Sequence, residues 1–365
     1  MPLANGGIAD DSRIKAAVPT LEHLAERGAK VIVISHLGRP KGVDPSLSLR
    51  PVAAALSTPL GREVRFAEDC VGQAARGAVG RLQEGEVLLL ENVRFHPEDE
   101  ANDPEFANRL AALGEVFVND AFAASHRAHA SVVGVATRLP AYAGELMLAE
   151  LTALHKALDD PRRPLVAVVG GAKVSTKVGV LTHLLEKVDA LLVGGAMANT
   201  FFRAQGFPTG SGLVEESALK AATEVEKKGG QKLVLPVDLV CARKMEAGQE
   251  LETVAANAVQ AGWMALDIGL KSVAEFSEHI AAAKTIVWNG PMGVAEIADF
   301  SKGTKAVGEA IARSGAYTLV GGGDTVAAID ALGLSGFSHV STGGGATLEY
   351  LEGKELPGVA ILKDA

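Results

Sequence analysis

The sequence predicts an α/β protein built on parallel sheets, and three observations carry this prediction. Short runs of four to six apolar residues recur along the chain, and they are continuous rather than alternating, which is typical of strands buried on both faces. Stretches with helical spacing lie between the runs, so strand and helix alternate as in parallel α/β sheets. The runs end in Gly, Ser, Asn or Asp, and ligands of such sheets bind beyond the carboxyl ends of the strands.

The expected elements follow one another along the whole chain. Strands are expected at residues 31–35, 87–92, 116–120, 166–171, 191–195, 285–290, 318–323 and 340–345. Helices are expected between them, for example at Ser12 to Arg27, Val180 to Val188 and Thr304 to Arg313. Gly28 and Gly315 follow the first and third of these helices, and glycine commonly ends a helix.

A domain boundary is expected near residues 150–164. The 365 residues suggest about two domains. Residues 145–159 have helical spacing, and a segment with two prolines, 159–164, then breaks the chain. Residues 1–150 contain 12 Arg and 3 Lys, whereas residues 151–365 contain 5 Arg and 15 Lys. This shift is either compositional drift or a sign that the first half grips carboxylate or phosphate, which the Arg fork binds with two hydrogen bonds.

The composition argues against several classes of ligand and location. With 35 Lys and Arg against 44 Asp and Glu the net charge is −9, so neither nucleic acid nor a membrane surface is expected as a partner. Cys70 and Cys241 are too far apart in sequence to suggest a disulfide framework or a thiolate zinc site, and His126 with His129 lacks a third metal ligand. No export signal or apolar run of about 20 residues is present, so a cytoplasmic location is expected.

Basic clusters in the first half fit a small anion. His36 and Arg39 lie in a loop after an expected strand, an arrangement that serves as an anion clamp or is simply a solvated turn. Arg94 and Arg127 could each form a surface ion pair. Together with Arg13 and Arg39 they could instead surround one multiply charged molecule.

Glycine clusters in the second half predict a nucleotide site. Residues 170–177 follow a buried strand and open a helix, so backbone amides and two lysines could meet a phosphate chain there. Glycine triplets at 321–323 and 343–345 also follow strands, and Asp324 could hold the magnesium that a nucleotide brings. Glu296 could accept hydrogen bonds from a ribose, or it is an ordinary acidic residue at a helix entry. No Walker A or G-x-G-x-x-G motif occurs.

Ten segments of the chain, in this order and spacing, resemble the phosphoglycerate kinase family. They are residues 13–20, 35–40, 90–95, 120–131, 170–177, 194–201, 266–269, 287–294, 321–325 and 341–346. The resemblance implies two doubly wound, Rossmann-like domains facing each other across a cleft. It also implies reversible phosphoryl transfer between 1,3-bisphosphoglycerate and ADP, giving 3-phosphoglycerate and ATP in glycolysis and gluconeogenesis, with Mg²⁺ as cofactor.

The resemblance further implies how the chain is divided and what it assembles with. Residues 1–150 would bind phosphoglycerate, residues 151–163 would form an interdomain helix and hinge, and residues 164–346 would bind the nucleotide. Residues 347–365 would return to the first domain. The protein is expected to be a monomer whose partners are its small-molecule substrates.

Individual site residues follow from the same resemblance. The residues implied to bind phosphoglycerate are Arg13, His36, Leu37, Gly38, Arg39, Arg94 and Arg127. Those implied to bind the nucleotide are Lys177, Gly269, Asn289, Glu296, Gly322, Gly323, Asp324 and Thr325, with Asp324 also organising Mg²⁺. Charge on the transferred group would be met by Arg13, by Lys173 and by the backbone amides of Gly343, Gly344 and Gly345.

One departure from the family concerns the start of the chain. Family members begin with a strand that runs into Arg-x-Asp-x-Asn-Val-Pro, whereas this chain begins at the residue before Pro2. We expect a misplaced start in the reading frame, with the first strand and two substrate ligands missing from the sequence. The alternative is a true start at Met1 and a weakly active or non-catalytic nucleotide-binding relative. A dinucleotide-dependent dehydrogenase is disfavoured because its glycine fingerprint is missing.

Overall fold

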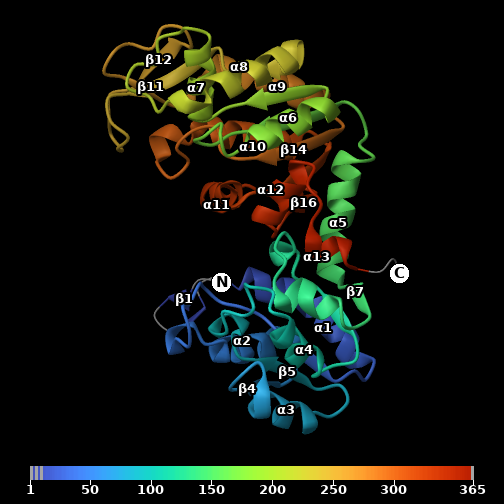
Figure 1. The fold of residues 1–365 in the computed structure, drawn as a ribbon. Helices are drawn as coiled ribbons and strands as arrows, with labels where there is room; N and C mark the ends of the chain where they lie inside the picture. Colours follow the sequence, from blue (N-terminus) through green and yellow to red (C-terminus); the bar gives the residue numbers. More distant parts are fainter. Residues whose placement is uncertain (1–2, 5–6, 9–10, 363–365) are drawn as a thin grey trace. The chain divides into compact units, whose positions relative to one another are not determined.

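The structure is a computed structural model that describes residues 3–4, 7–8 and 11–362, and its chain divides into two units (Figure 1). Unit 1 comprises Met1–Glu150 and Glu355–Ala365, and unit 2 comprises Leu151–Lys354. The division falls inside the helix α5 (Glu145–Leu158). The expectation about the start of the chain concerns Met1 and Pro2, which lie outside the described residues, so it stays a prediction.

Unit 2 is built on a six-stranded parallel sheet with the strand order β10-β9-β8-β14-β15-β16. The strands are β8 (Leu165–Val169), β9 (Ala190–Val193), β10 (Leu233–Val234), β14 (Thr285–Asn289), β15 (Tyr317–Val320) and β16 (His339–Val340). Val166 and Val168 of β8 share one core cluster with helix residues, while Leu165 and Val169 point to the opposite face and are also fully buried. Both faces are therefore covered, which explains the continuous apolar runs of the sequence.

The helices that accompany this sheet alternate with its strands. They are α6 (Val178–Lys187), α7 (Met197–Ala204), α8 (Leu219–Gly229), α9 (Leu270–Ala282), α10 (Lys302–Arg313), α11 (Gly323–Leu332) and α12 (Gly345–Leu351). Phe276 and Ile280 of α9 and Val307 of α10 complete the core cluster on one face of the sheet. The sequence predictions of α6 and α10 are confirmed, although each helix begins two residues earlier than predicted.

A second sheet in unit 2 was missed by the sequence analysis. It is antiparallel, with the order β12-β11-β13, and consists of β11 (Asp238–Ala242), β12 (Glu252–Ala255) and β13 (Met264–Ile268). The side chains of β12 alternate between partly buried and exposed, so this segment lacks the continuous apolar run by which the other strands were recognised. The prediction of parallel sheets alone was therefore incomplete.

Unit 1 carries its parallel strands in two sheets. One has the order β3-β5-β4, formed by β3 (Val31–Val33), β4 (Val64–Ala67) and β5 (Val87–Leu90), and the other pairs β6 (Phe117–Asn119) with β7 (Ala141–Ala143). A short antiparallel pair, β1 (Leu3–Ala4) and β2 (Gly7–Ile8), precedes them. Among the described residues, β3 and β6 each have a neighbouring strand on one edge only.

Helices and the end of the chain complete unit 1. The helices are α1 (Ser12–Glu26), α2 (Arg50–Leu60), α3 (Gly72–Gly80), α4 (Pro104–Ala111) and α13 (Pro357–Ala360). Gly28 has a φ of 82° just after α1, as expected for a glycine that ends a helix. Near the C-terminus, the backbone N–H of Gly358 donates to Ser125 O at 2.8 Å, and Asn119 Nδ2 donates to Gly358 O at 2.8 Å.

No helix in the described part of the chain combines the length and the apolar character needed to cross a membrane.

A substitution at Phe276 tests the packing of α9 against the six-stranded sheet of unit 2. Phe276 is fully buried, so Phe276→Ala should lower the free energy of unfolding of unit 2 by about 3–5 kcal/mol. The two tryptophans, Trp263 and Trp288, both lie buried in unit 2, so their fluorescence in a urea titration reports on this unit. Leu270→Ala is the control in the same helix, because Leu270 is 83% exposed. A Phe276→Ala variant as stable as this control would contradict the assignment of Phe276 to the core.

Candidate active site

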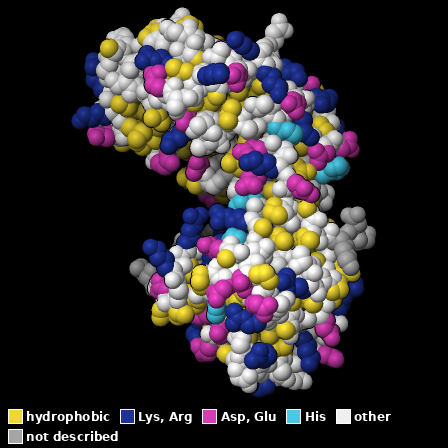
Figure 2. Space-filling view, viewed as in Figure 1, with side chains coloured by type: hydrophobic (Ala, Val, Ile, Leu, Met, Phe, Trp, Pro, Cys, Tyr) yellow, Lys and Arg dark blue, Asp and Glu magenta, His cyan; other side chains and the backbone are white. Residues whose placement is uncertain are grey.

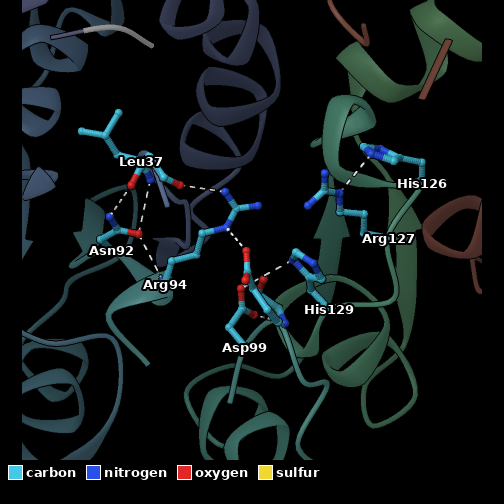
Figure 3. Close-up of polar contacts among 10 residues, drawn as sticks. Leu37, Asn92, Arg94, Asp99, His126, Arg127 and His129 are labelled. Atoms are coloured by element: carbon cyan, nitrogen blue, oxygen red, sulfur yellow. Dashed lines mark hydrogen bonds and ion pairs between the residues drawn. The ribbon is translucent and has the colours of Figure 1, made fainter. Parts of the chain in front are cut away.

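The loops that follow β3 and β5 in unit 1 are joined by the side chain of Asn92 (Figure 3). Asn92 is fully buried and lies two residues after the end of β5. Its Nδ2 donates to Leu37 O at 2.8 Å and to Leu47 O at 3.0 Å, and its Oδ1 accepts from the backbone N–H of Arg94 at 3.1 Å. Parallel strands bring both loops to one edge of the sheet, and Asn92 then holds them together.

Arg94 is a largely enclosed basic residue at this edge. Its side chain is only 10% exposed, and its NH1 donates to Gly38 O at 2.8 Å. Its Nε lies 3.3 Å from a Glu100 oxygen, but among the described residues this buried nitrogen has no hydrogen-bond acceptor. Burial lowers the pKa of Arg94, and the positive charges of Arg127 and Arg39 lower it further, against the effect of Glu100. Arg39 and Arg127 therefore both lie within electrostatic reach of Arg94.

His36 lies in the same positive field. Burial lowers its pKa to about 3, and the charges of Arg94, His129 and Arg13 act in the same direction. The imidazole of His36 is therefore neutral at physiological pH. His36 can contribute only a hydrogen bond, so any anion bound here owes its charge neutralisation to the arginines.

Two further histidines, His126 and His129, lie beside the charged residues of this site. The pKa of His129 is lowered, chiefly by burial and against the effect of Asp99, whose Oδ2 lies 3.8 Å from His129 Nδ1. Arg127 Nε donates to His126 Nε2 at 3.1 Å, which orients the guanidinium group (Figure 3). Figure 2 shows Lys and Arg side chains gathered on one part of the unit 1 surface.

The expected phosphoglycerate ligands do not all present their side chains. Arg13, near the start of α1, and Arg39 are exposed, and Arg127 is partly buried. Leu37 is buried and Gly38 has a φ of 65°, where a Cβ would meet the Leu47 side chain at 3.0 Å. These last two residues can therefore offer a ligand only their backbone groups.

Lys177 is the central cation of the glycine-rich loops of unit 2. It directly precedes α6, and its Nζ donates to Gly170 O at 2.6 Å and to Asn289 Oδ1 at 2.7 Å. Burial lowers the pKa of Lys177 to about 8, although the charge of Asp324 opposes this effect. The expected helix after residue 170 begins only at Val178, so Lys173 and Lys177 both lie in the loop before α6.

Asn289 and Thr325 connect this loop to its neighbours. Asn289 Nδ2 donates to Gly321 O at 3.0 Å, and the backbone N–H of Gly290 donates to Thr325 Oγ1 at 2.6 Å. Both side chains are buried, so they hold the ends of β14 and β15 together rather than facing solvent. Gly322 has a φ of 96°, and a Cβ there would approach Asn289 Nδ2 to 2.9 Å. The close packing of these loops thus requires glycine.

The other expected nucleotide residues lie on separate elements. Gly269 precedes α9, and a Cβ there would lie 2.3 Å from the Asp238 carboxylate. Glu296 is exposed and lies two residues before the 3₁₀ turn Ala298–Phe300 and six residues before α10. Gly344, with a φ of 39°, directly precedes α12.

Exposed groups at these loops could meet phosphates and a metal. Lys173, Gly323 and Asp324 are all exposed, and Asp324 lies in the first turn of α11. Mg²⁺ is commonly held by one or two carboxylates together with substrate phosphates and water. An exposed carboxylate close enough to act electrostatically on Lys177 fits this requirement.

Some positioning residues were not assigned from the sequence. Asn92 belongs to the family-like segment 90–95, and its place after a buried strand is a signal that it could bridge loops. Asp238 and Ser272 had no such signal. Ser272 Oγ donates to Asp238 Oδ1 at 2.6 Å, and the backbone N–H of Lys271 donates to Asp238 Oδ2 at 3.1 Å. This pair fixes the start of α9 beside Gly269.

Comparisons with known proteins agree on one family. Residues 1–354 match the family model described as Phosphoglycerate kinase. A phosphoglycerate kinase of Moorella thermoacetica is 53% identical over 369 residues, covering 100% of this chain and 94% of the relative. A cytosolic phosphoglycerate kinase of Triticum aestivum is 51% identical and covers 98% of this chain and 91% of the relative.

Solved structures give the same result. The phosphoglycerate kinase of Coxiella burnetii superposes with a TM-score of 0.91 at 44% identity, and that of Pyrococcus horikoshii with a TM-score of 0.86 at 35% identity. Each match covers 99% of this chain and 93% of the solved chain. The fold of two Rossmann-like domains is thereby confirmed.

The lowered pKa of Lys177 predicts a pH dependence of stability. Its pKa is about 8 in the folded chain against 10.5 unfolded, so the unfolded chain binds more protons between these values. The free energy of unfolding of unit 2 should rise with pH from 8 to 10.5, by on the order of 3 kcal/mol relative to Lys177→Met. Urea titrations followed by tryptophan fluorescence measure this difference, with Lys173→Met as the control in the same loop. Parallel pH profiles for the wild type and Lys177→Met would contradict it.

Proposed function

The chain belongs to the phosphoglycerate kinase family, and we propose how its two units divide the transfer of a phosphoryl group between 1,3-bisphosphoglycerate and ADP. The reaction is reversible, yields 3-phosphoglycerate and ATP, and is a step of glycolysis. Unit 1 binds the phosphoglycerate, and unit 2 binds the nucleotide. The observation that carries this division is the electrostatic coupling of Arg94 with Arg39 and Arg127.

The arginines of unit 1 suit a small ligand with several negative charges. Like charges held this close repel one another, so an anion between them gains from all of them at once. Arg94 offers a buried Nε without an acceptor among the described residues, and the exposed Arg13 and Arg39 can close around the ligand. The neutral His36 adds a hydrogen bond, and Leu37 and Gly38 contribute backbone groups.

The loops of unit 2 suit the phosphates of a nucleotide. Lys177 places a positive charge behind the loops, where Asn289 and Thr325 act as positioning residues. Backbone amides of Gly322 and Gly323 then face the phosphate chain. We assign Gly269 and Glu296 to the nucleoside end of the nucleotide. The assignment rests on the family resemblance and on their positions before α9 and α10, away from the loop that carries Lys177.

A Mg²⁺ ion would be held by Asp324 together with phosphate oxygens and water. When bound, it supplies neutralisation of charge on the phosphate chain. The exposed position of Asp324 in the first turn of α11 supports this assignment.

The protein contributes alignment and charge rather than acid–base chemistry. The acceptor is a carboxylate or an ADP phosphate, neither of which must lose a proton, so no general base is needed. Arg13, Lys173 and the backbone amides of Gly344 and Gly345 neutralise the transferred group. The Gly343 N–H, expected from the sequence to join them, instead donates to Ser341 Oγ at 3.1 Å. Because donor and acceptor bind to different units, we propose that the units close during each turnover and exclude water.

We further propose that the chain acts as a monomer in the cytoplasm. A relative named cytosolic supports the location. Analytical ultracentrifugation measures the mass of the particle in solution and so tests the monomer.

No observation favours the alternative of a non-catalytic nucleotide-binding relative.

The activity itself is tested with ATP, Mg²⁺ and 3-phosphoglycerate in a coupled assay of ADP formation. We expect turnover that depends on all three components. No turnover by a folded full-length chain would contradict the proposed function.

Arg39 tests the phosphoglycerate site. Arg39→Met should raise the KM for 3-phosphoglycerate roughly 10- to 100-fold and leave the KM for ATP unchanged, because a hydrogen bond to a charged group contributes about 1.5–3 kcal/mol. Arg39 is exposed, so the change should not disturb folding. Arg76→Met removes another exposed arginine of unit 1 and is the matched control. Equal KM values for the two variants would refute the role of Arg39.

Asp324 tests the metal assignment. Asp324→Asn should raise the Mg²⁺ concentration needed for half-maximal rate by about tenfold or more, the cost of losing one charged contact. Rates measured across a Mg²⁺ series at fixed ATP give this value. Asp330→Asn changes an exposed carboxylate of the same helix and should behave as the wild type. A Mg²⁺ requirement that Asp324→Asn leaves unchanged would remove Asp324 from the metal site.

A further inference from the structure

Three side chains with metal-binding atoms meet in unit 1, apart from the groups assigned above. Asp69 and Cys70 follow β4, and His96 follows the 3₁₀ turn Val93–Phe95 after β5. Because β4 and β5 pair in parallel, the two loops leave the sheet at the same edge. A carboxylate oxygen of Asp69, Cys70 Sγ and an imidazole nitrogen of His96 all lie within 4.8 Å of one another.

The packing of the unit holds these side chains in place. His96 Nε2 lies 2.8 Å from Asp69 Oδ1, and the ring packs on Phe106 with a centroid distance of 5.2 Å. Asp69 Oδ1 also accepts from the backbone N–H of Cys70 at 2.7 Å. Cys70 is only 1% exposed and belongs to the core cluster under α3 and α4. Ligands that are already ordered lose little conformational freedom on binding an ion.

The donor atoms select the kind of ion. One sulfur, one imidazole nitrogen and one carboxylate oxygen form a set that suits Zn²⁺, whereas Mg²⁺ prefers oxygen ligands and water. Burial raises the pKa of the Cys70 thiol, and the negative charges of Asp69 and the buried Asp99 raise it further. The same two carboxylates that oppose a bare thiolate attract a cation to this place.

We propose that Asp69, Cys70 and His96 form a binding site for a zinc-like divalent cation. Water completes the fourth position, as in zinc sites with three protein ligands. On binding, the Cys70 thiol releases its proton to solvent and the thiolate bonds to the ion, which replaces the direct contact between His96 and Asp69. The ion cross-links the loop after β4 to the loop after β5.

Cadmium is the probe, because a Cd²⁺–thiolate bond adds an ultraviolet absorption band. The metal-free full-length chain is titrated with Cd²⁺, and we expect one saturable band per chain that Zn²⁺ removes and excess Mg²⁺ leaves unchanged. Cys70→Ala should lose the band. Cys241→Ala should keep it, because Cys241 is the other buried cysteine and is not part of the cluster. Circular dichroism establishes that each variant is folded.

Two further variants keep the thiol and test the other ligands. The side chains of His96 and Asp69 are 26% and 40% exposed, so His96→Gln and Asp69→Asn should fold even if Cys70→Ala does not. Each substitution should weaken Cd²⁺ binding by at least about tenfold. Even the replacement of a residue that only hydrogen-bonds to a metal ligand lowers metal affinity by that much. The proposal is overturned by the absence of a saturable band in the wild type, by a band that persists in Cys70→Ala, or by unchanged affinity in both ligand variants.

Discussion

Parallel strand pairing is the constraint on which the candidate site depends. In unit 2, β8, β14 and β15 pair in parallel, so their chains leave the sheet at one edge. Gly170, Asn289 and Gly321 arrive there together, although more than 100 positions separate the first two. The strands are buried on both faces, and their register therefore sets which backbone groups meet at this edge.

A buried asparagine at a strand end recurs as the device that joins neighbouring loops. Asn92 and Asn119 in unit 1 and Asn289 in unit 2 each use the amide group both to donate and to accept. A side-chain amide can donate a hydrogen bond to one loop and accept one from another. Burying such a polar group costs free energy unless it makes these hydrogen bonds. These bonds order the loops before any ligand binds, which lowers the entropy cost of binding.

The two units hold positive charge in different ways. Unit 1 gathers arginines whose mutual repulsion an anion relieves, and unit 2 surrounds a single lysine with carbonyl and amide oxygens. Burial lowers the pKa of both Arg94 and Lys177, because the charged forms are taken from water. A phosphate bound to either site would return favourable interactions to these cations. Burying these cations destabilises the folded protein, and the same buried charges then favour the binding of phosphate.

The sequence alone determined the parallel α/β class, the main strands and the motifs that identify the family, because continuous apolar runs and glycine clusters are local patterns. It did not reveal the antiparallel sheet of β11, β12 and β13, whose strand β12 alternates between partly buried and exposed residues. It also did not reveal the split of the unit 1 strands into two sheets. Only the tertiary structure decided that His36 is neutral, that Asn289 and Thr325 face inward, and that Asp69, Cys70 and His96 meet. Burial and proximity in space depend on residues far apart in the chain, and no local pattern records them.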